Sequence, residues 1–121
     1  MGKIEIKDNF FIVSLAMQKE IRNIRRTIIL SDLIHRYNCT LDKKIKTING
    51  KEYHFCQSKK DIYEKLNITK NTYNSAIKKL EQKGFITTFY DRDPNNVMRY
   101  ITFFKLNIDL INSIDNMLIQ K

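Results

Sequence analysis

Side chains suited to hydrogen bonding and cation contact gather along one side of the segment 70–83. Placing successive residues 100° apart, as in an α-helix, brings Asn71, Ser75 and Lys78 to one side and the apolar residues to the other. The segment has one carboxylate, Glu81, at the flank of the polar side. Amide, hydroxyl and ammonium groups in this arrangement bind a polar or anionic partner without covalent chemistry. The pattern therefore predicts a binding surface.

Catalytic and metal-binding patterns are weak throughout the chain. The acids are scattered singly, and three glycines make no phosphate-binding loop. A hydrolase needs a nucleophile beside a base, and a nuclease needs clustered carboxylates. Cys39 and Cys56 form no C-x-x-C pair, and His35 and His54 are far apart in sequence. We expect no enzymatic activity, no metal, no cofactor and a structural role for these four residues.

The charge and hydropathy patterns limit the classes of partner that the chain can bind. A net charge of +9 suits a polyanion, most often nucleic acid, and residues 65–83 carry five lysines against one acid. No apolar run is long enough to span a membrane, and the first residues lack the apolar region of a signal peptide. We expect a single domain over residues 1–121, no membrane partner and a cytoplasmic location with reduced cysteines.

Periodicity and turn signals predict an ordered series of elements. They are a helix over about 23–37, a short hairpin turning at Asn49-Gly50, two close helices, a second hairpin and a final amphipathic helix. In the second hairpin, runs 85–90 and 97–104 flank the turn-rich "DRDPNN". Whether the first helix begins earlier, near Ser14, stays open, because "FFIVSLAM" fits either a strand or a buried helical turn.

The two close helices carry specific end signals. Ser58 and Asp61 are spaced as a capping box, which predicts the start of the first helix. Asn67 tolerates the positive φ that ends a helix, and Thr69 caps the next helix. That second helix runs to about Lys83 before Gly84 and buries a face made of Tyr73, Ala76, Ile77 and Leu80.

Residues 58–86, "SKKDIYEKLNITKNTYNSAIKKLEQKGFI", resemble the helix-turn-helix of winged helix proteins. "LNIT" stands where members usually have a Leu-Gly-Ile-Ser-like turn, and "AIKKLEQKGFI" looks like a recognition helix running into the first wing strand. The resemblance implies an α+β, mainly α fold, with the helix-turn-helix at 58–83, a β-hairpin wing at 85–104 and an extra C-terminal helix at 107–120. The layout is also similar to small winged-helix proteins of low-GC bacterial plasmids and phages, namely replication-initiator N-terminal domains, conjugation-origin binders and partition adaptors.

The resemblance implies a binding mode for duplex DNA. In this family the second helix of the motif lies in the major groove, where each base pair shows a distinct donor and acceptor pattern. Asn71 and Asn74 then suit adenine, and Lys78 suits guanine or a phosphate. The implied contacts are Thr69, Lys70, Asn71, Asn74, Ser75, Lys78 and Lys79 on the recognition helix, Lys59 and Lys60 on the DNA backbone, and Arg92, Asn95, Asn96 and Arg99 in the wing. An AT-rich site would suit the wing, because its minor groove is narrow and strongly negative.

Several alternatives remain open from the sequence. Arg92 can pair instead with Asp91 or Asp93, and the C-terminal helix can pack within the subunit instead of forming the expected homodimer. The expected function is sequence-specific duplex-DNA binding for a mobile element in replication, partition or conjugative transfer, alongside other proteins of such a complex. A transcriptional repressor of the same fold, a protein–protein adaptor and a single-strand binder are the other readings. The single-strand reading requires Phe89, Tyr90 and Tyr100 to be exposed.

Overall fold

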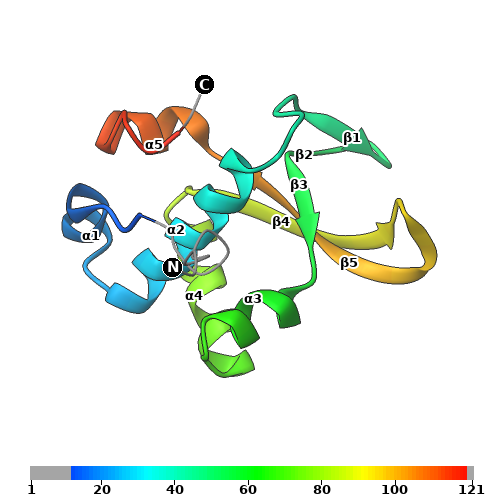
Figure 1. Cartoon of the computed structure of the whole chain (residues 1–121), viewed down its shortest axis with the longest axis horizontal. Helices are drawn as coiled ribbons and strands as arrows, with labels where there is room; N and C mark the ends of the chain where they lie inside the picture. The colour runs from blue at the N-terminus through cyan, green and yellow to red at the C-terminus, as the bar shows by residue number, and fades with distance from the viewer. Residues whose placement is uncertain (1–11, 120–121) are drawn as a thin grey trace, which may run out of the picture.

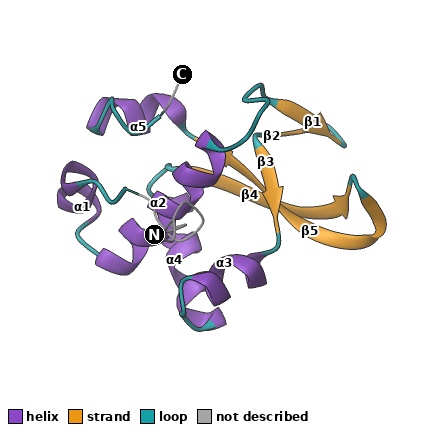
Figure 2. Ribbon diagram, in the orientation of Figure 1, coloured by secondary structure: helices purple, strands orange, loops and turns teal. Residues whose placement is uncertain are grey.

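Helices gather on one side of the molecule and strands on the other in the computed structural model, which describes residues 12–119 (Figures 1 and 2). The elements in chain order are α1 (Leu15–Ile21), α2 (Ile24–Asn38), β1 (Lys46–Ile48), β2 (Lys51–Tyr53), β3 (Phe55–Gln57), α3 (Lys59–Lys65), α4 (Lys70–Gln82), β4 (Ile86–Asp93), β5 (Asn96–Leu106) and α5 (Ile108–Ile114). This order confirms the predicted α+β, mainly helical class. Within this order α3 and α4 form a helix-turn-helix, and β4 and β5 form the two-stranded wing that follows it.

The first two helices each begin at a residue whose side chain caps the free backbone amides. The Ser14 hydroxyl accepts a hydrogen bond from the backbone N–H of Met17 at 3.1 Å and starts α1, which answers the question left open by the sequence. Arg22 then adopts a left-handed conformation with φ 60°, and the Asn23 side chain caps α2. The core face of α2 includes Leu30 and Leu33, both fully buried. The helix predicted over about 23–37 is confirmed.

The wing sheet has the strand order β3-β5-β4, with both pairings antiparallel. Alternating side chains of β5 face opposite sides, so Phe104 enters the main core while Phe103 enters a second cluster. Both rings are fully buried, and Phe103 meets Tyr53 edge-on with a ring-centroid distance of 4.7 Å. The base of the wing is therefore covered on both faces.

The small β1–β2 hairpin is fixed to this sheet by side chains. Asn49 and Gly50 both have positive φ, as the Asn-Gly turn predicts. The Asn49 amide donates to Asp91 at 2.8 Å, and Lys105 pairs with Glu52 at 2.8 Å. These contacts lower the pKa of Asp91 and of Glu52. These contacts hold the β1–β2 hairpin against the wing strands β4 and β5.

Three sequence expectations need correction. The wing strands run longer than the predicted runs 85–90 and 97–104, because Ile86–Asp93 and Asn96–Leu106 leave only Pro94 and Asn95 as the turn. At this tip Asp93 accepts hydrogen bonds from the Arg99 guanidinium and the Asn95 N–H. The helix predicted over 107–120 ends at Ile114, because the Asp115 carboxylate accepts hydrogen bonds from the Ser14 hydroxyl and the Met117 N–H. Ser58 makes no capping hydrogen bond through its side chain.

The turn between α3 and α4 follows the prediction. Asn67 has φ 55°, and the Ile68 N–H donates to the Tyr63 carbonyl at 3.0 Å. The Thr69 hydroxyl accepts from the Thr72 N–H at 3.1 Å and begins α4. The left-handed residue and the immediate cap together reverse the chain within a few residues.

A buried carboxylate joins α2 to this helix-turn-helix. The Asp32 side chain is fully buried and accepts from Arg36 Nε at 2.8 Å on the same helix. Its other oxygen lies 3.3 Å from the Lys65 ammonium, at the end of α3. A buried carboxylate is costly without such partners, so this geometry favours one placement of α3 against α2.

We expect Asp32→Ala to lower the free energy of unfolding by about 3 kcal/mol, since it removes a fully buried partner of two cations. Urea unfolding followed by circular dichroism measures the change. Glu20→Ala, at an exposed position on α1, is the control and should stay within about 0.5 kcal/mol of the original chain. Equal stability of the two variants would contradict a positioning role for Asp32.

Candidate nucleic-acid interface

The outward face of α4 presents an unbroken polar surface. Asn71, Asn74, Ser75, Lys78 and Lys79 are all exposed. The opposite face, with Tyr73, Ala76, Ile77 and Leu80, is buried as predicted. The amphipathic division of this helix therefore leaves its amide, hydroxyl and ammonium groups free to meet a partner outside the fold.

The single acid of α4 is directed away from that surface. Glu81 Oε2 accepts hydrogen bonds from the backbone N–H and the hydroxyl of Thr88, both at 3.1 Å. Thr88 belongs to β4, so this carboxylate ties the end of α4 to the wing. The outward face keeps only neutral and positive groups.

The hydroxyl of Thr69 has a local role. It accepts from the Thr72 N–H and donates to the Thr72 hydroxyl at 2.9 Å. The helix start, with exposed Lys70 beside it, still presents a positive end. Thr69 thus shapes the start of α4 through its cap, while its predicted contact with DNA stays a prediction.

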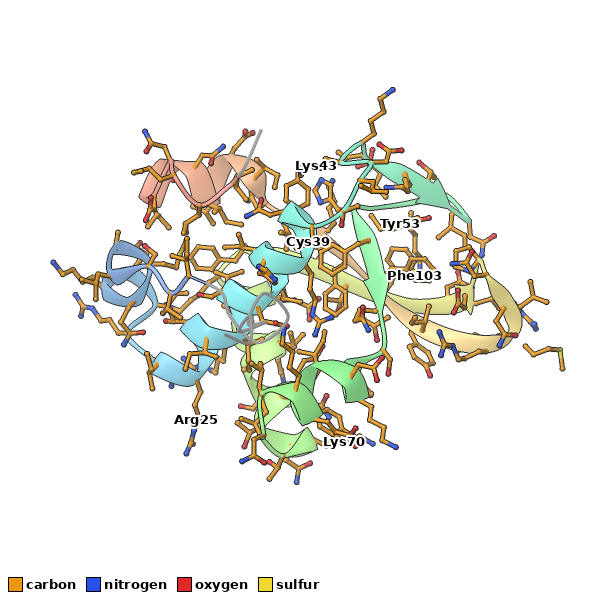
Figure 3. All side chains as sticks on the ribbon, viewed as in Figure 1. Arg25, Cys39, Lys43, Tyr53, Lys70 and Phe103 are labelled. Carbon is orange, nitrogen blue, oxygen red and sulfur yellow. The ribbon has the colours of Figure 1, made fainter. Side chains whose placement is uncertain are left out.

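Two arginines that the sequence analysis missed extend the polar face. Arg25 and Arg26 at the start of α2 line a hollow of about 310 Å³ together with Asn71, Ser75 and Thr72 of α4. Figure 3 shows Arg25 at the same edge of the molecule as Lys70. The Arg25-Arg26 pair, which follows the Asn23 cap after one intervening residue, was the available signal. Its proximity to α4 depends on how α2 packs, which local sequence does not reveal.

The lysines of α3 stand on the other flank of α4. Lys59, Lys60 and Lys70 line a hollow between the helix-turn-helix and the wing. Lys60 also lies 4.0 Å from Glu64 one turn along, with both side chains largely exposed, so this pair contributes little. The structure brings the predicted backbone contacts and the predicted recognition helix to one region.

The wing residues divide into two groups. Arg99 pairs with the buried Asp93 at 2.6 Å, and Asp93 also accepts from the Asn95 backbone N–H at 2.8 Å. The Asn95 N–H and the Arg99 guanidinium lower the pKa of Asp93. Arg99 therefore helps to order the tip. Its predicted DNA contact would have to be made alongside this ion pair.

Arg92, the other arginine predicted to contact DNA from the wing, has a different environment. Arg92 donates to the Val97 carbonyl at 2.9 Å, and its guanidinium carbon lies 5.4 Å from the centre of the Tyr100 ring. The salt bridge with Asp91 or Asp93 that the sequence left open for Arg92 is thus not what holds this side chain. Asn95 and Asn96 are exposed beside it, with the Asn96 oxygen accepting from the Met98 N–H.

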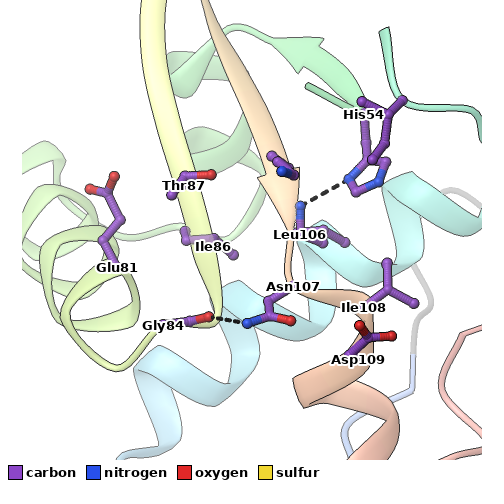
Figure 4. A pocket seen from close by; sticks show the side chains of 11 residues that line it. His54, Glu81, Gly84, Ile86, Thr87, Leu106, Asn107, Ile108 and Asp109 are labelled. Atoms are coloured by element: carbon purple, nitrogen blue, oxygen red, sulfur yellow. Dashed lines mark hydrogen bonds between the residues drawn. The ribbon is translucent and has the colours of Figure 1, made fainter. Parts of the chain in front are cut away.

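A third hollow, of about 540 Å³, lies where α4 runs into the wing (Figure 4). Gly84 has φ 83°, a conformation that favours glycine, and its carbonyl accepts from the Asn107 side chain at 2.9 Å. His54 Nδ1 accepts from the Leu106 N–H at 3.0 Å. These bonds fix the direction in which the chain leaves α4 and returns from β5.

His54 predicts a pH dependence of stability. Burial, then the charges of Lys105 and Lys46, lower its pKa below the ordinary value of 6.5, so the folded chain favours the neutral ring. Stability is then present above about pH 6.5 and declines as the pH falls toward 5, because the unfolded chain takes up the proton more readily. Urea midpoints measured between about pH 7 and about pH 5 test this decline.

One variant assigns the effect to this ring. His54→Gln, which cannot titrate, should have a smaller decline over the same pH range than the original chain. The carboxylates with lowered pKa act mainly below this window, since their ordinary pKa is 3.8 for aspartate and 4.5 for glutamate. An undiminished decline in His54→Gln would overturn the assignment.

Comparison with known proteins agrees with this geometry. A family model described as winged helix-turn-helix DNA-binding matches residues 57–87, from the end of β3 through α3 and α4 into β4. No curated protein matches the chain, and no solved structure matches it. The fold is consistent with a winged helix-turn-helix, and residues 57–87 are similar to winged helix-turn-helix DNA-binding domains.

None of the helices within residues 12–119 is long and apolar enough to cross a membrane. Across the same residues, no group of three or more His, Cys, Asp or Glu side chains is arranged to hold a metal ion.

Proposed function

We propose that this protein binds duplex DNA sequence-specifically, with α4 in the major groove. The observation that carries the proposal is the outward face of α4, which exposes amides, a hydroxyl and ammonium groups while Glu81 is held against Thr88. Base edges in the major groove are read by such groups, and a carboxylate on this face would repel the phosphates.

The roles of individual side chains follow from their chemistry. Asn71 and Asn74 present amides for bidentate contact with adenine, and Ser75 can bond either a base or a phosphate. Lys78 contacts guanine or the backbone. Arg25 and Arg26, beside Asn71 across the hollow, hold phosphates on one flank of α4, and Lys59, Lys60 and Lys70 hold them on the other.

The wing would extend the contact beyond the major groove. Arg92, Asn95 and Asn96 are exposed at its outer part and can follow the adjacent minor groove. An AT-rich flank would strengthen this contact because its minor groove is narrow and more negative. Arg99 contributes chiefly by ordering the tip through Asp93.

We further propose a homodimer that reads two half-sites and acts in the cytoplasm for a plasmid, phage or other mobile element. Leu15 and Met117 are exposed close in sequence to Ser14 and Asp115, whose side chains hydrogen-bond each other, and these two apolar side chains support pairing. Replication, partition or conjugative transfer, with other proteins of such a complex, is the proposed setting. Control of transcription by the same contacts is the alternative, and a promoter palindrome would favour it.

The test is selection from a random duplex pool followed by binding measurements at about 0.15 M salt. We expect a defined motif to be enriched, and Asn71→Ala to lose about 1–3 kcal/mol of preference for it over unrelated duplex. Thr47→Ala, at an exposed polar position in β1, is the control and should keep the preference. Failure to enrich any motif would overturn sequence-specific binding.

Lys78→Ala separates base reading from backbone contact. If Lys78 holds a phosphate, the variant should weaken binding to all duplexes equally and reduce the salt slope by about one unit. Lys43→Ala is the charge-matched control, because Lys43 and Lys70 lie at opposite ends of the molecule in Figure 3. Equal losses from Lys43→Ala and Lys78→Ala would show that only the overall charge matters.

A further inference from the structure

The hollow between the helix-turn-helix and the wing combines cations with aromatic rings. Its volume is about 200 Å³, and its lining includes Lys59, Lys60, Lys70, Tyr63, Tyr90 and Tyr100. Phosphate binding accounts for the lysines alone. Tyr63 packs against the core beside Tyr73, whereas the exposed rings of Tyr90 and Tyr100 suit a partner that also has a planar face.

The register of the wing explains why the rings face this hollow. Tyr90 lies opposite Thr102, and Arg92 lies opposite Tyr100. Because alternate residues of a strand face the same side, these residues share a face of the sheet with the pair Ile86 and Leu106. Ile86 and Leu106 belong to the core under the helices. Tyr90, Arg92 and Tyr100 therefore continue the helix-facing side of the sheet outward, beyond the point where the core ends.

These three side chains form a stack that is open to solvent. The Tyr90 and Tyr100 rings are stacked with centroids 5.6 Å apart and planes 26° apart, and the Arg92 guanidinium lies over Tyr100. Tyr90 is 62% exposed and Tyr100 48% exposed. Phe89, on the opposite face of β4, instead stacks on Phe103 within the second core, so it is unsuited to the same role.

We propose that this hollow binds single-stranded DNA, with an unpaired base stacking on the Tyr90–Tyr100 pair and its phosphates contacting Lys59, Lys60 and Lys70. A basic groove with exposed aromatic rings is the usual means of binding single strands. Bases inside a duplex are already stacked on their neighbours and cannot offer a free face to a ring. This activity goes beyond the duplex binding proposed above, and would let the protein hold a junction where paired and unpaired DNA meet.

The experiment measures binding of a labelled oligothymidylate of about 12 nucleotides, within the span of known single-strand sites, and of the enriched duplex, by fluorescence anisotropy. The double variant Tyr90→Ala/Tyr100→Ala should weaken single-strand binding about tenfold or more and leave duplex binding within about twofold. Tyr90→Phe/Tyr100→Phe, which keeps the rings, should retain single-strand binding. Leu41→Ala, which removes another exposed apolar side chain, is the control and should change neither.

Three results would overturn the inference. Single-strand binding that survives loss of both rings would exclude stacking. A loss in the phenylalanine variant as large as in the alanine variant would assign the tyrosines to hydroxyl contacts with phosphate. Equal losses of duplex and single-strand binding would place the two rings, like the lysines beside them, in the duplex interface. Asn71→Ala keeps the two proposals distinguishable, because it should impair duplex recognition and spare the oligothymidylate.

Discussion

The buried carboxylate of Asp32 is the constraint on which the placement of the helix-turn-helix depends. It accepts from Arg36 within α2 and from Lys65 at the end of α3, so one side chain ties the central helix to the motif. Leaving this carboxylate unpaired in the core would be costly, which penalises other placements of α3. The short turn through Asn67 then carries that placement into α4.

The direction of α4 is fixed independently at each end, and this produces the exposed polar face. Thr69 caps its start, while Glu81 and Gly84 connect its end to the wing and to Asn107. With its apolar side on α2 and the sheet, the helix can present only its amide, hydroxyl and ammonium side chains outward. The proposed function follows from this constraint more than from the overall charge, part of which lies elsewhere on the surface.

Local signals predicted the features that depend on local physics. Three such predictions are confirmed: the positive φ of Asn67, the cap that Thr69 makes with a nearby backbone amide, and the burial of Tyr73 and Leu80 on one face of a helix. Each depends only on the residue and its neighbours in sequence. The pairing of β3 with β5 and the approach of Arg25 to α4 arise from tertiary packing and were missed. The predicted capping box was wrong: the Ser58 side chain makes no capping hydrogen bond, and Asp61 accepts from the Gln57 side chain.

The central claim is that α4 meets duplex DNA with its outward face. Backbone and side-chain amide NMR spectra of the labelled protein, recorded during titration with the enriched duplex, test it most directly. The account predicts the largest shifts at Asn71, Asn74 and Ser75, with smaller ones at Arg25 and Arg26. Shifts confined to α1, α5 or the β1–β2 hairpin, with α4 unchanged, would contradict it.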